Sequence, residues 1–537
     1  MSRHVLAIGV AIAMVGCGTD VRDEPADEAT GGEVTGPSTT MHGSEASSAS
    51  TGTVDDTGGT KLDVGAGNDI GGTVVPLTCA DVVRLSTNQG CEFWAVDLPN
   101  VSDVQIIEPP ANQQFAVVVS NPSMLTSANV EIFVGDSDTA VASGVVPIDT
   151  IRVFELDAMN IAPATTSAEG TAYRIAADAP IVAYQFQPLD NANPVYSNDA
   201  TILFPTHVLD GDYTAITGDA VLVGVDSFSS SDANTGAFVS VVGTEDGTTV
   251  TLYPTALLHP GEIENVVIDR GQVLTAISSQ RGSPRWGNLS GTRVVADKPV
   301  AVFSGSVSTS EPADADVCCA DHVEHQMLPL TAWGTSYVAS PAAAATGGAS
   351  DATQIRITGA FDGTELVYDP ARPAGAPASI DAYQTVAFVT DAAFTVRAAD
   401  DAKPFAVAQF LLSNQYFGEL LRPGDPSMIL VPAAAQYEDR YAFLVPQGYA
   451  SDFVTVVRPT GSTTTLDGVA VAAAFTPLGA LDVPYEYGHI AVEPGAHTIE
   501  GDDPFGITIV GYAQDVSYGY CGGSGVEVIS TPPPPPG

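Results

Sequence analysis

The chain has 537 residues, of which 45% are hydrophobic, so it can bury the core of one large domain or of several average domains. Acidic residues outnumber basic residues by 64 to 18, which gives a formal net charge of −46. This charge excludes a general nucleic-acid-binding surface and binding to anionic membranes, because both partners are negatively charged. We interpret it as the charge of an exported, soluble protein, although it would also attract cations or basic partners.

The N-terminus has the pattern of an export signal. An apolar run over residues 5–15 is too short to cross a bilayer as a helix. Gly16 and Cys17 follow it, which resembles a bacterial lipobox, although Met14 departs from the usual leucine. We therefore predict a signal peptide over residues 1–16 and lipidation at Cys17. A simple cleaved signal with a leftover cysteine is the alternative.

A tether is predicted over residues 17–75. From Gly18 onward the segment is rich in Gly, Ser, Thr and acidic residues and contains no Phe, Trp or Tyr, so it cannot bury enough apolar surface to become ordered. Such a tether would hold the folded body, residues 76–529, away from a membrane. Gly18 rather than Asp after the cysteine favours the outer membrane or cell surface. Residues 530–537 are predicted to form an extended, solvated polyproline tail.

The body has the pattern of an all-β repeat protein. Short runs of Val, Ile, Thr, Phe and Tyr alternate with Gly, Asp, Asn and Pro, and Asp-Gly turns link strand pairs. An acidic residue, a proline and an apolar strand recur in residues 176–189, 295–308, 400–413 and 501–514. We expect each proline to end one strand and open the next. A second motif, which runs from a proline to a tyrosine, recurs within residues 204–213, 328–337 and 431–441.

The spacing predicts four repeats of roughly 100–120 residues. Each repeat has enough candidate strands for two four-stranded blades or for one sandwich. We favour a β-propeller of about eight small blades, because the strands that begin with proline are apolar on both faces. Tandem β-sandwiches are the alternative.

The stretch CCADHVEHQ, residues 318–326, has the residue types of a chemical site. Cys318, Cys319, His322 and His325 are possible zinc ligands, because two histidines three residues apart can share one face of a helix. The adjacent cysteines could instead form a redox-active vicinal disulfide. We favour a third interpretation, a short structural turn, because the other repeats lack cysteine and histidine at the corresponding place. Hence we predict no bound metal and no cofactor.

In this favoured interpretation, an aspartate caps one helical turn at each repeat junction. Asp321 has Glu324 three residues later, which is the spacing of a capping box. Asp199 and Asp425 occupy the corresponding positions in the neighbouring repeats, and Asp425 is followed by a proline, which suits a first helical position.

The cysteines are expected to form disulfides because the chain is exported. Cys79 and Cys91 are close enough in sequence for a local bond. Cys521 is the natural partner of Cys318 or Cys319, which would staple the turn, but the sequence leaves the connectivity of these three open.

Four segments resemble one known family. They are AYRIAADAPIVAYQFQPLDN, SNDATILFPTHVLDGDY, GTRVVADKPVAVFSG and CCADHVEHQMLPLTAWGTSYV. They resemble the N-terminal domain family of the IgGFc-binding protein, over about residues 115–515. The resemblance implies a secreted adhesion or binding module without known catalytic residues.

Few patterns indicate catalysis. The sequence contains no HExxH zinc motif, P-loop, GxSxG nucleophile elbow or SxxK motif. Acidic pairs such as Asp400 and Asp401 are expected by chance in so acidic a chain. Five aromatic residues are predicted to pack at repeat junctions: Tyr184, Phe186, Trp333, Tyr337 and Tyr441.

The sequence therefore predicts an exported, lipid-anchored binding or adhesion protein that is not an enzyme. Its partner would be a protein or glycan at the cell surface, and it would meet the membrane only through the anchor. A secreted polysaccharide hydrolase and a structural surface-layer or stalk protein are the alternatives.

Overall fold

A computed structural model of the protein describes residues 78–535, apart from 85, 103–108, 124, 160, 162–166, 190–196, 222–235, 259–262, 279–284, 316, 318–319, 347–349, 420–421 and 480–482. These residues belong to one compact unit, Val74–Gly537. The predicted signal peptide, lipidated Cys17 and tether lie outside the described residues, as do Cys318 and Cys319.

The regular secondary structure of the described chain is almost entirely β-strand, so the all-β prediction is confirmed. None of its described helices is long and apolar enough to cross a membrane. The first repeat contains α1 (Cys79–Val82), β1 (Gly90–Ala95), η1 (Pro110–Asn112), β2 (Phe115–Asn121), β3 (Ala128–Val134), β4 (Ala140–Val146), β5 (Thr150–Leu156), β6 (Ser167–Thr171), β7 (Tyr173–Gln187) and β8 (Asp199–Leu203). The second contains η2 (Thr206–Val208), β9 (Asp210–Thr214), β10 (Ala220–Val221), β11 (Ala237–Gly243), β12 (Thr248–Tyr253), β13 (Val266–Ile268), β14 (Gln272–Ile277), β15 (Arg285–Trp286), β16 (Arg293–Thr309), η5 (Ala313–Ala315) and β17 (Asp321–Gln326).

The third and fourth repeats each also begin with a short 3-10 helix and end with a short strand. The third contains η6 (Leu330–Ala332), β18 (Ser336–Ala339), β19 (Thr353–Gly359), β20 (Thr364–Asp369), β21 (Ser379–Ile380), β22 (Thr385–Thr390), β23 (Phe394–Ala398), β24 (Phe405–Phe410), η7 (Asn414–Phe417) and β25 (Met428–Leu430). The fourth contains η8 (Ala434–Gln436), β26 (Glu438–Val445), β27 (Ser451–Pro459), β28 (Thr464–Leu466), β29 (Val469–Ala470), β30 (Thr476–Pro477), β31 (Tyr485–Val492), β32 (Gly495–Ala513) and β33 (Val516–Cys521).

Each repeat has two antiparallel sheets, and β6 of the first repeat pairs with β14 in a sheet of the second repeat. In the third repeat the sheets are separate, with the strand orders β18-β23-β20-β21 and β22-β19-β24-β25. In the other three repeats one long strand serves both sheets. The first half of β7, for example, pairs with β1 and β3, and its second half pairs with β2 and β8. β16 and β32 do the same in the second and fourth repeats.

The repeated proline marks the change from one sheet to the other. Pro404 lies between β23 and β24, as predicted, but Pro180, Pro299 and Pro504 lie inside β7, β16 and β32. The prediction that each proline ends a strand is therefore wrong in three repeats. The regular pairing with a partner strand is interrupted opposite each of these prolines, where the register shifts. Because the ladder is already interrupted there, the strand can continue although proline has no N–H to donate.

In three repeats a tyrosine forms hydrogen bonds at the place where the chain passes from one sheet to the other. Its hydroxyl accepts a hydrogen bond from the backbone N–H three residues earlier and donates one to the carbonyl of the residue after the repeated proline. The three sets are Tyr213 with Asp210 and Val300, Tyr337 with Gly334 and Phe405, and Tyr441 with Glu438 and Phe505. These are the tyrosines of the proline-to-tyrosine motif, which explains why the two motifs recur together.

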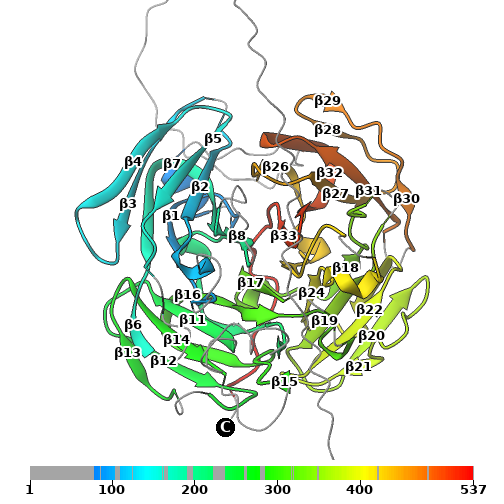
Figure 1. Cartoon of the computed structure of the whole chain (residues 1–537), viewed down its shortest axis with the longest axis horizontal. Coiled ribbons are helices and arrows are strands. Elements are labelled where there is room, and N and C mark those ends of the chain that lie inside the picture. The colour runs from blue at the N-terminus through cyan, green and yellow to red at the C-terminus, as the bar shows by residue number, and fades with distance from the viewer. Residues whose placement is uncertain are drawn as a thin grey trace, which may run out of the picture. The chain divides into compact units, whose positions relative to one another are not determined.

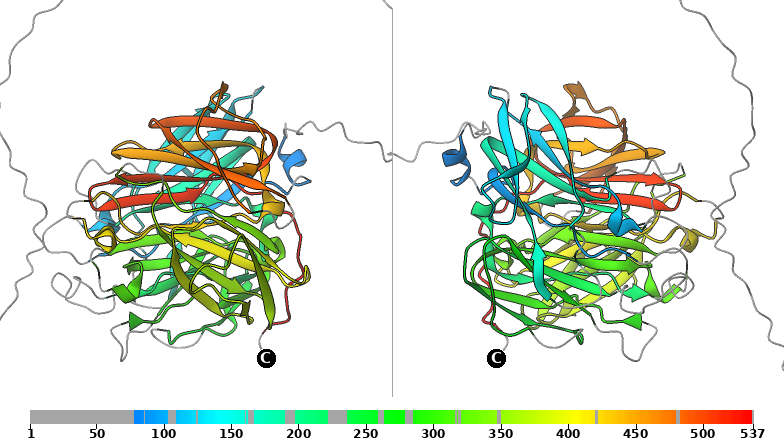
Figure 2. Two further views of the ribbon diagram at one scale, coloured as in Figure 1. Left: turned by 90° about the vertical axis from the view of Figure 1, so that its right-hand side faces the viewer. Right: turned by 60° about the vertical axis from the view of Figure 1, so that its left-hand side comes forward.

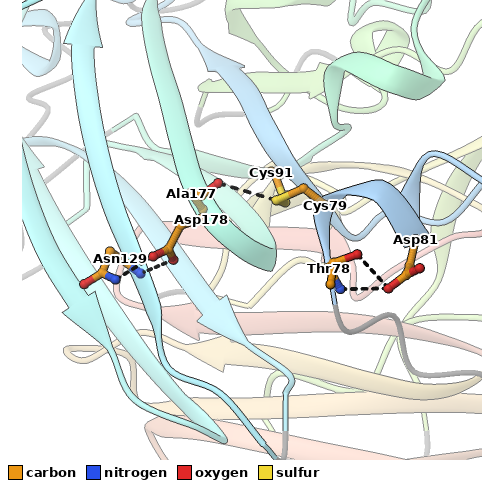
Figure 3. The surroundings of a disulfide bond; sticks show 7 residues. All are labelled: Thr78, Cys79, Asp81, Cys91, Asn129, Ala177 and Asp178. Carbon is orange, nitrogen blue, oxygen red and sulfur yellow. Dashed lines mark hydrogen bonds between the residues drawn. A yellow bond between two sulfur atoms is a disulfide. The ribbon is translucent and has the colours of Figure 1, made fainter.

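The first repeat uses a disulfide near this place. Phe93 pairs with Ile175 in β7, as Tyr213 pairs with Val294 in β16, but phenylalanine has no hydroxyl. The predicted bond between Cys79 and Cys91 is confirmed, with an S–S distance of 2.07 Å. Figure 3 shows this disulfide between α1 and β1, close to Ala177 on β7.

The last strand of each repeat contacts its counterparts in the neighbouring repeats. β8 contacts β17, β17 contacts β25, β25 contacts β33, and β33 contacts β8. Figure 1 shows β8, β17 and β33 between the larger groups of strands. We call these four strands the inner strands. Tyr184 links the first and last repeats, because its hydroxyl donates to the carbonyls of Ala442 and Gly522. All five aromatics predicted to pack at junctions are buried.

Residues 531–535 at the C-terminus are exposed or partly exposed, as expected of a solvated tail, but they also bind the body. Arg293 donates hydrogen bonds to the carbonyls of Pro533 and Pro534, so the end of the described chain is bound to the second repeat. Figure 2 shows this segment running from the last strand along the body towards the C-terminus.

Candidate functional site

The DHVEHQ part of the cysteine-histidine stretch is strand β17, and all six of its residues are buried. It pairs antiparallel with β16, from Phe303 opposite Gln326 to Thr309 opposite Asp321. The predicted helical turn is therefore wrong at Asp321. It is also wrong at the other two junctions, because Asp199 begins strand β8 and Asp425 lies in non-helical chain before β25. The spacing of a capping box is present, but pairing with β16 determines the conformation.

The two histidines do not share a face. Successive side chains of a strand point to opposite sides, so His322 and His325 diverge. His322 Nε2 lies 3.1 Å from Glu324 Oε2, whereas His325 Nδ1 donates to the Gln326 carbonyl at 2.7 Å. Within the described ranges no group of three or more His, Cys, Asp and Glu side chains could hold a metal ion. The helical zinc geometry proposed from the sequence is therefore not formed.

Cys521 does not form the predicted disulfide. Its thiol is free and buried, and its Sγ lies 3.9 Å from His325 Nε2. Burial raises the pKa of this thiol to about 12. A protonated thiol in such a position behaves as a small packed side chain rather than as a nucleophile.

Asp199 connects all four inner strands. Its Oδ1 accepts hydrogen bonds from its neighbour Ala200 N–H at 2.9 Å and from Ser427 Oγ at 2.6 Å, beside β25. Its Oδ2 accepts from Glu324 N–H in β17 and Met428 N–H in β25, both at 3.1 Å. Gly519 N–H in β33 lies 3.4 Å from Oδ1. Burial raises the pKa of Asp199, and the hydrogen bonds from Ser427, Met428 and Glu324 oppose that rise.

A row of side chains on and before β8 satisfies the open edge of β17. Ser197 Oγ, Asp199 Oδ2 and Thr201 Oγ1 accept hydrogen bonds from alternate N–H groups of β17, those of His322, Glu324 and Gln326. The inner strands thus meet through side chains rather than through a backbone ladder. Each buried edge N–H in this row obtains an acceptor, which a closed core requires.

Glu324 and His322 form a neutral pair inside this core. Both are fully buried, and burial raises the pKa of Glu324 well above its usual range and lowers the pKa of His322 to about 3. Glu324 Oε1 also accepts a hydrogen bond from Gln185 Nε2 at 3.0 Å. Gln185 and Gln187 in turn bind the backbone of Val96 and Leu98.

This cluster contains general-acid and general-base side chains, but it is closed to solvent. Asp199, His322, Glu324 and His325 each have 0% of their surface exposed. A substrate cannot reach them in this conformation. The hydrogen bonds of Asp199 to β17, β25 and β33 instead join the repeats. Sequence reasoning missed Gln185 and Gln187. Two glutamines at alternate positions of an otherwise apolar strand were the available signal.

Comparison with known proteins identifies the family. A family model described as IgGFc binding protein matches residues 199–511, which is more than half of the chain. The chain belongs to the IgGFc binding protein family. The family resemblance predicted from the sequence is thereby confirmed. The matched range begins at Asp199 and includes β8, β17 and β25, so it covers three of the four inner strands.

The individual relatives are more distant. The human IgGFc-binding protein is 28% identical over 249 residues, which cover 45% of this chain. The same region is only 4% of that protein's length. Among solved structures, an anti-sigma factor domain-containing protein from Clostridium clariflavum aligns over 76% of this chain and 99% of its own, at 9% identity. Its TM-score of 0.10 is too low to indicate a shared fold.

Proposed function

We propose that this protein is an exported, lipid-anchored surface protein that binds a macromolecular ligand and performs no catalysis. Membership of the IgGFc binding protein family carries this proposal, because the named human relative is an IgGFc-binding protein. A protein ligand is therefore the first candidate and a glycan the second. The ligand would contact the exposed strands and loops of the repeats, since the inner strands are buried.

The burial of the inner cluster supports binding over hydrolysis. A glycosidase needs two carboxyl groups on either side of an accessible sugar. Glu324 and Asp199 are sealed in the core. The exposed Asp400 shapes a turn instead, because its Oδ1 accepts the Ala402 N–H at 3.0 Å. No specific observation favours the hydrolase or the stalk alternative.

The propeller arrangement is part of this proposal. The cyclic contacts of β8, β17, β25 and β33, and the link from Tyr184 to the fourth repeat, support four repeats closed around the inner strands. Single repeats should then be unstable alone, because each would expose its inner strand. Limited proteolysis that yields four independently folded fragments of roughly 100 residues would instead support tandem sandwiches.

Binding is best tested with the full chain. It would be immobilised and exposed first to IgG Fc fragment and then to proteins and glycans from the surface of the producing cells. We expect saturable binding of a protein and no release of reducing sugar from polysaccharides. Sugar release by the purified chain, without saturable protein binding, would overturn the proposal.

The anchor has a separate test. Cys17→Ala should move the exported chain from the detergent phase to the aqueous phase on phase partitioning. Cys521→Ala is the matched control, because that thiol is buried, and it should not change partitioning. Equal partitioning of the Cys17 variant and the unmodified chain would contradict lipidation.

A further inference from the structure

The side chain of Arg293, the first residue of β16, is fully buried, and all five of its N–H groups have acceptors. Nε donates to Asp212 Oδ1 at 2.7 Å, and Nη2 donates to Asp212 Oδ2. Nη1 donates to the Tyr383 hydroxyl. The two remaining N–H groups bind the C-terminal segment, from Nη2 to the Pro533 carbonyl and from Nη1 to the Pro534 carbonyl at 3.1 Å.

We propose that Arg293, Asp212 and Tyr383 form a binding site for an extended proline-rich segment, which residues 531–535 of the same chain occupy as a clasp. A polyproline chain has no N–H groups and leaves its carbonyls free as acceptors. A planar guanidinium can donate to two successive carbonyls while it stays paired with a carboxylate. Without the segment, two donors of a buried cation would lose their protein partners.

The backbone around Arg293 is shaped to bring Tyr383 from the third repeat to this site. Gly291, two residues before Arg293, has φ +88°, which favours glycine. A Cβ there would lie 1.9 Å from the Tyr383 carbonyl oxygen. Tyr383 itself has φ 62°, and its ring centroid lies 5.7 Å from the Arg293 guanidinium carbon. The close approach of the two repeats therefore depends on Gly291.

The segment between β33 and the proline run also forms hydrogen bonds with the first, third and fourth repeats. These contacts join it to the start of the first repeat, to η8 of the fourth and to η6 of the third. They are Val526 N–H to Ser86 O at 2.8 Å, Gly525 N–H to Gln436 O at 2.8 Å, Gln436 Nε2 to Glu527 O at 3.0 Å, and the N–H groups of Ile529 and Ser530 to Thr331 O at 2.9 and 3.0 Å. Arg293 then binds Pro533 and Pro534 to the second repeat, so residues 525–535 together contact all four repeats.

The site should accept the segment as a free peptide. We would truncate the chain after Glu527 and titrate it with a peptide of residues 528–537 by calorimetry. We expect saturable one-to-one binding, weakened at least about tenfold by Arg293→Lys, because an ammonium cannot reproduce the fork of donors. A peptide with glycine in place of its prolines should also bind about tenfold more weakly, because it is less ordered when free.

Arg152→Lys is the matched control, since Arg152 lies on β5 and its side chain binds Val145 of the same repeat. It should leave peptide affinity unchanged. The proposal is overturned if the peptide does not bind saturably, or if the Arg293 variant binds it as tightly as the parent does.

The full chain provides a readout that does not depend on the truncated form. Hydrogen exchange at the Ile529 and Ser530 amides should be slow, because both donate to Thr331. Replacing Pro533 and Pro534 by glycine leaves Arg293 intact and should speed this exchange at least about tenfold, since the end of the clasp would be released. Unchanged exchange would contradict a clasp held at Arg293.

Discussion

Asp199→Asn tests whether one carboxylate joins the inner strands. Asparagine has nearly the same shape but replaces one acceptor oxygen with an NH₂ group. If Nδ2 takes the place of Oδ2, the N–H groups of Glu324 and Met428 lose their acceptor, and in the flipped orientation those of Ala200 and Gly519 lose theirs. Each buried donor without an acceptor costs about 1–3 kcal/mol, so the free energy of unfolding should fall by about 2–6 kcal/mol.

Urea unfolding followed by tryptophan fluorescence would measure this loss. Asp178→Asn is the matched control, because the Asp178 carboxylate accepts from Asn129 N–H and Nδ2 at the exposed surface, where water can replace it. Its cost should stay below about 1 kcal/mol. If the Asp199 variant does not fold, Thr201→Val removes a single acceptor, that of Gln326 N–H, and should cost about 1–3 kcal/mol. Loss of less than about 0.5 kcal/mol in Asp199→Asn would refute the reasoning, since the donors would then not need a carboxylate.

Three further changes test other parts of the structure. Tyr337→Phe removes the hydroxyl that binds Gly334 N–H and the Phe405 carbonyl and should cost about 1–2 kcal/mol in urea unfolding, so an unchanged midpoint would contradict the role of the tyrosine. Burial raises the pKa of Glu438 to about 8, so the folded chain binds more protons than the unfolded chain and stability should fall from pH 5 to pH 8. Glu438→Gln should make the free energy of unfolding depend less on pH over this range. If the variant loses stability as steeply as the parent, Glu438 is not the cause. His325→Ala should cost about 2–4 kcal/mol through a buried cavity without changing the zinc content measured by elemental analysis, whereas loss of one equivalent of zinc would restore the metal interpretation.

The sequence predicted those features whose causes lie within one repeat. Strand alternation and Asp-Gly turns are local signals, and they indicated an all-β chain correctly. The bond between Cys79 and Cys91 was predictable because the two residues are only twelve apart in sequence. The family could be predicted because four segments of the sequence resemble it directly, and the family model matches residues 199–511.

The sequence misled where pairing with another strand or binding to a distant segment decides the outcome. Asp321 and Glu324 have the spacing of a capping box, but β16 pairs with this segment and makes it a strand. The proline tail is exposed or partly exposed, as predicted, but the sequence did not show that it binds the body. Its actual partner is Arg293, 240 residues earlier in the chain, and no local pattern indicates that a guanidinium there still has two free donors.

The polar residues that most resemble catalytic groups follow from how the repeats meet. Each inner strand is the last strand of its sheet, so on its open side alternate N–H groups lack a backbone acceptor. Ser197, Asp199 and Thr201 supply those acceptors to β17, and Ser517 supplies one to Asp425 N–H at 2.8 Å. Short acceptors are therefore required along the inner strands whether or not the protein has an active site. It follows that the acidic and hydroxyl residues at these positions are poor evidence for an enzymatic activity of this chain. Residues that contact a ligand should instead be sought on the exposed strands and loops, where no buried backbone group requires a partner.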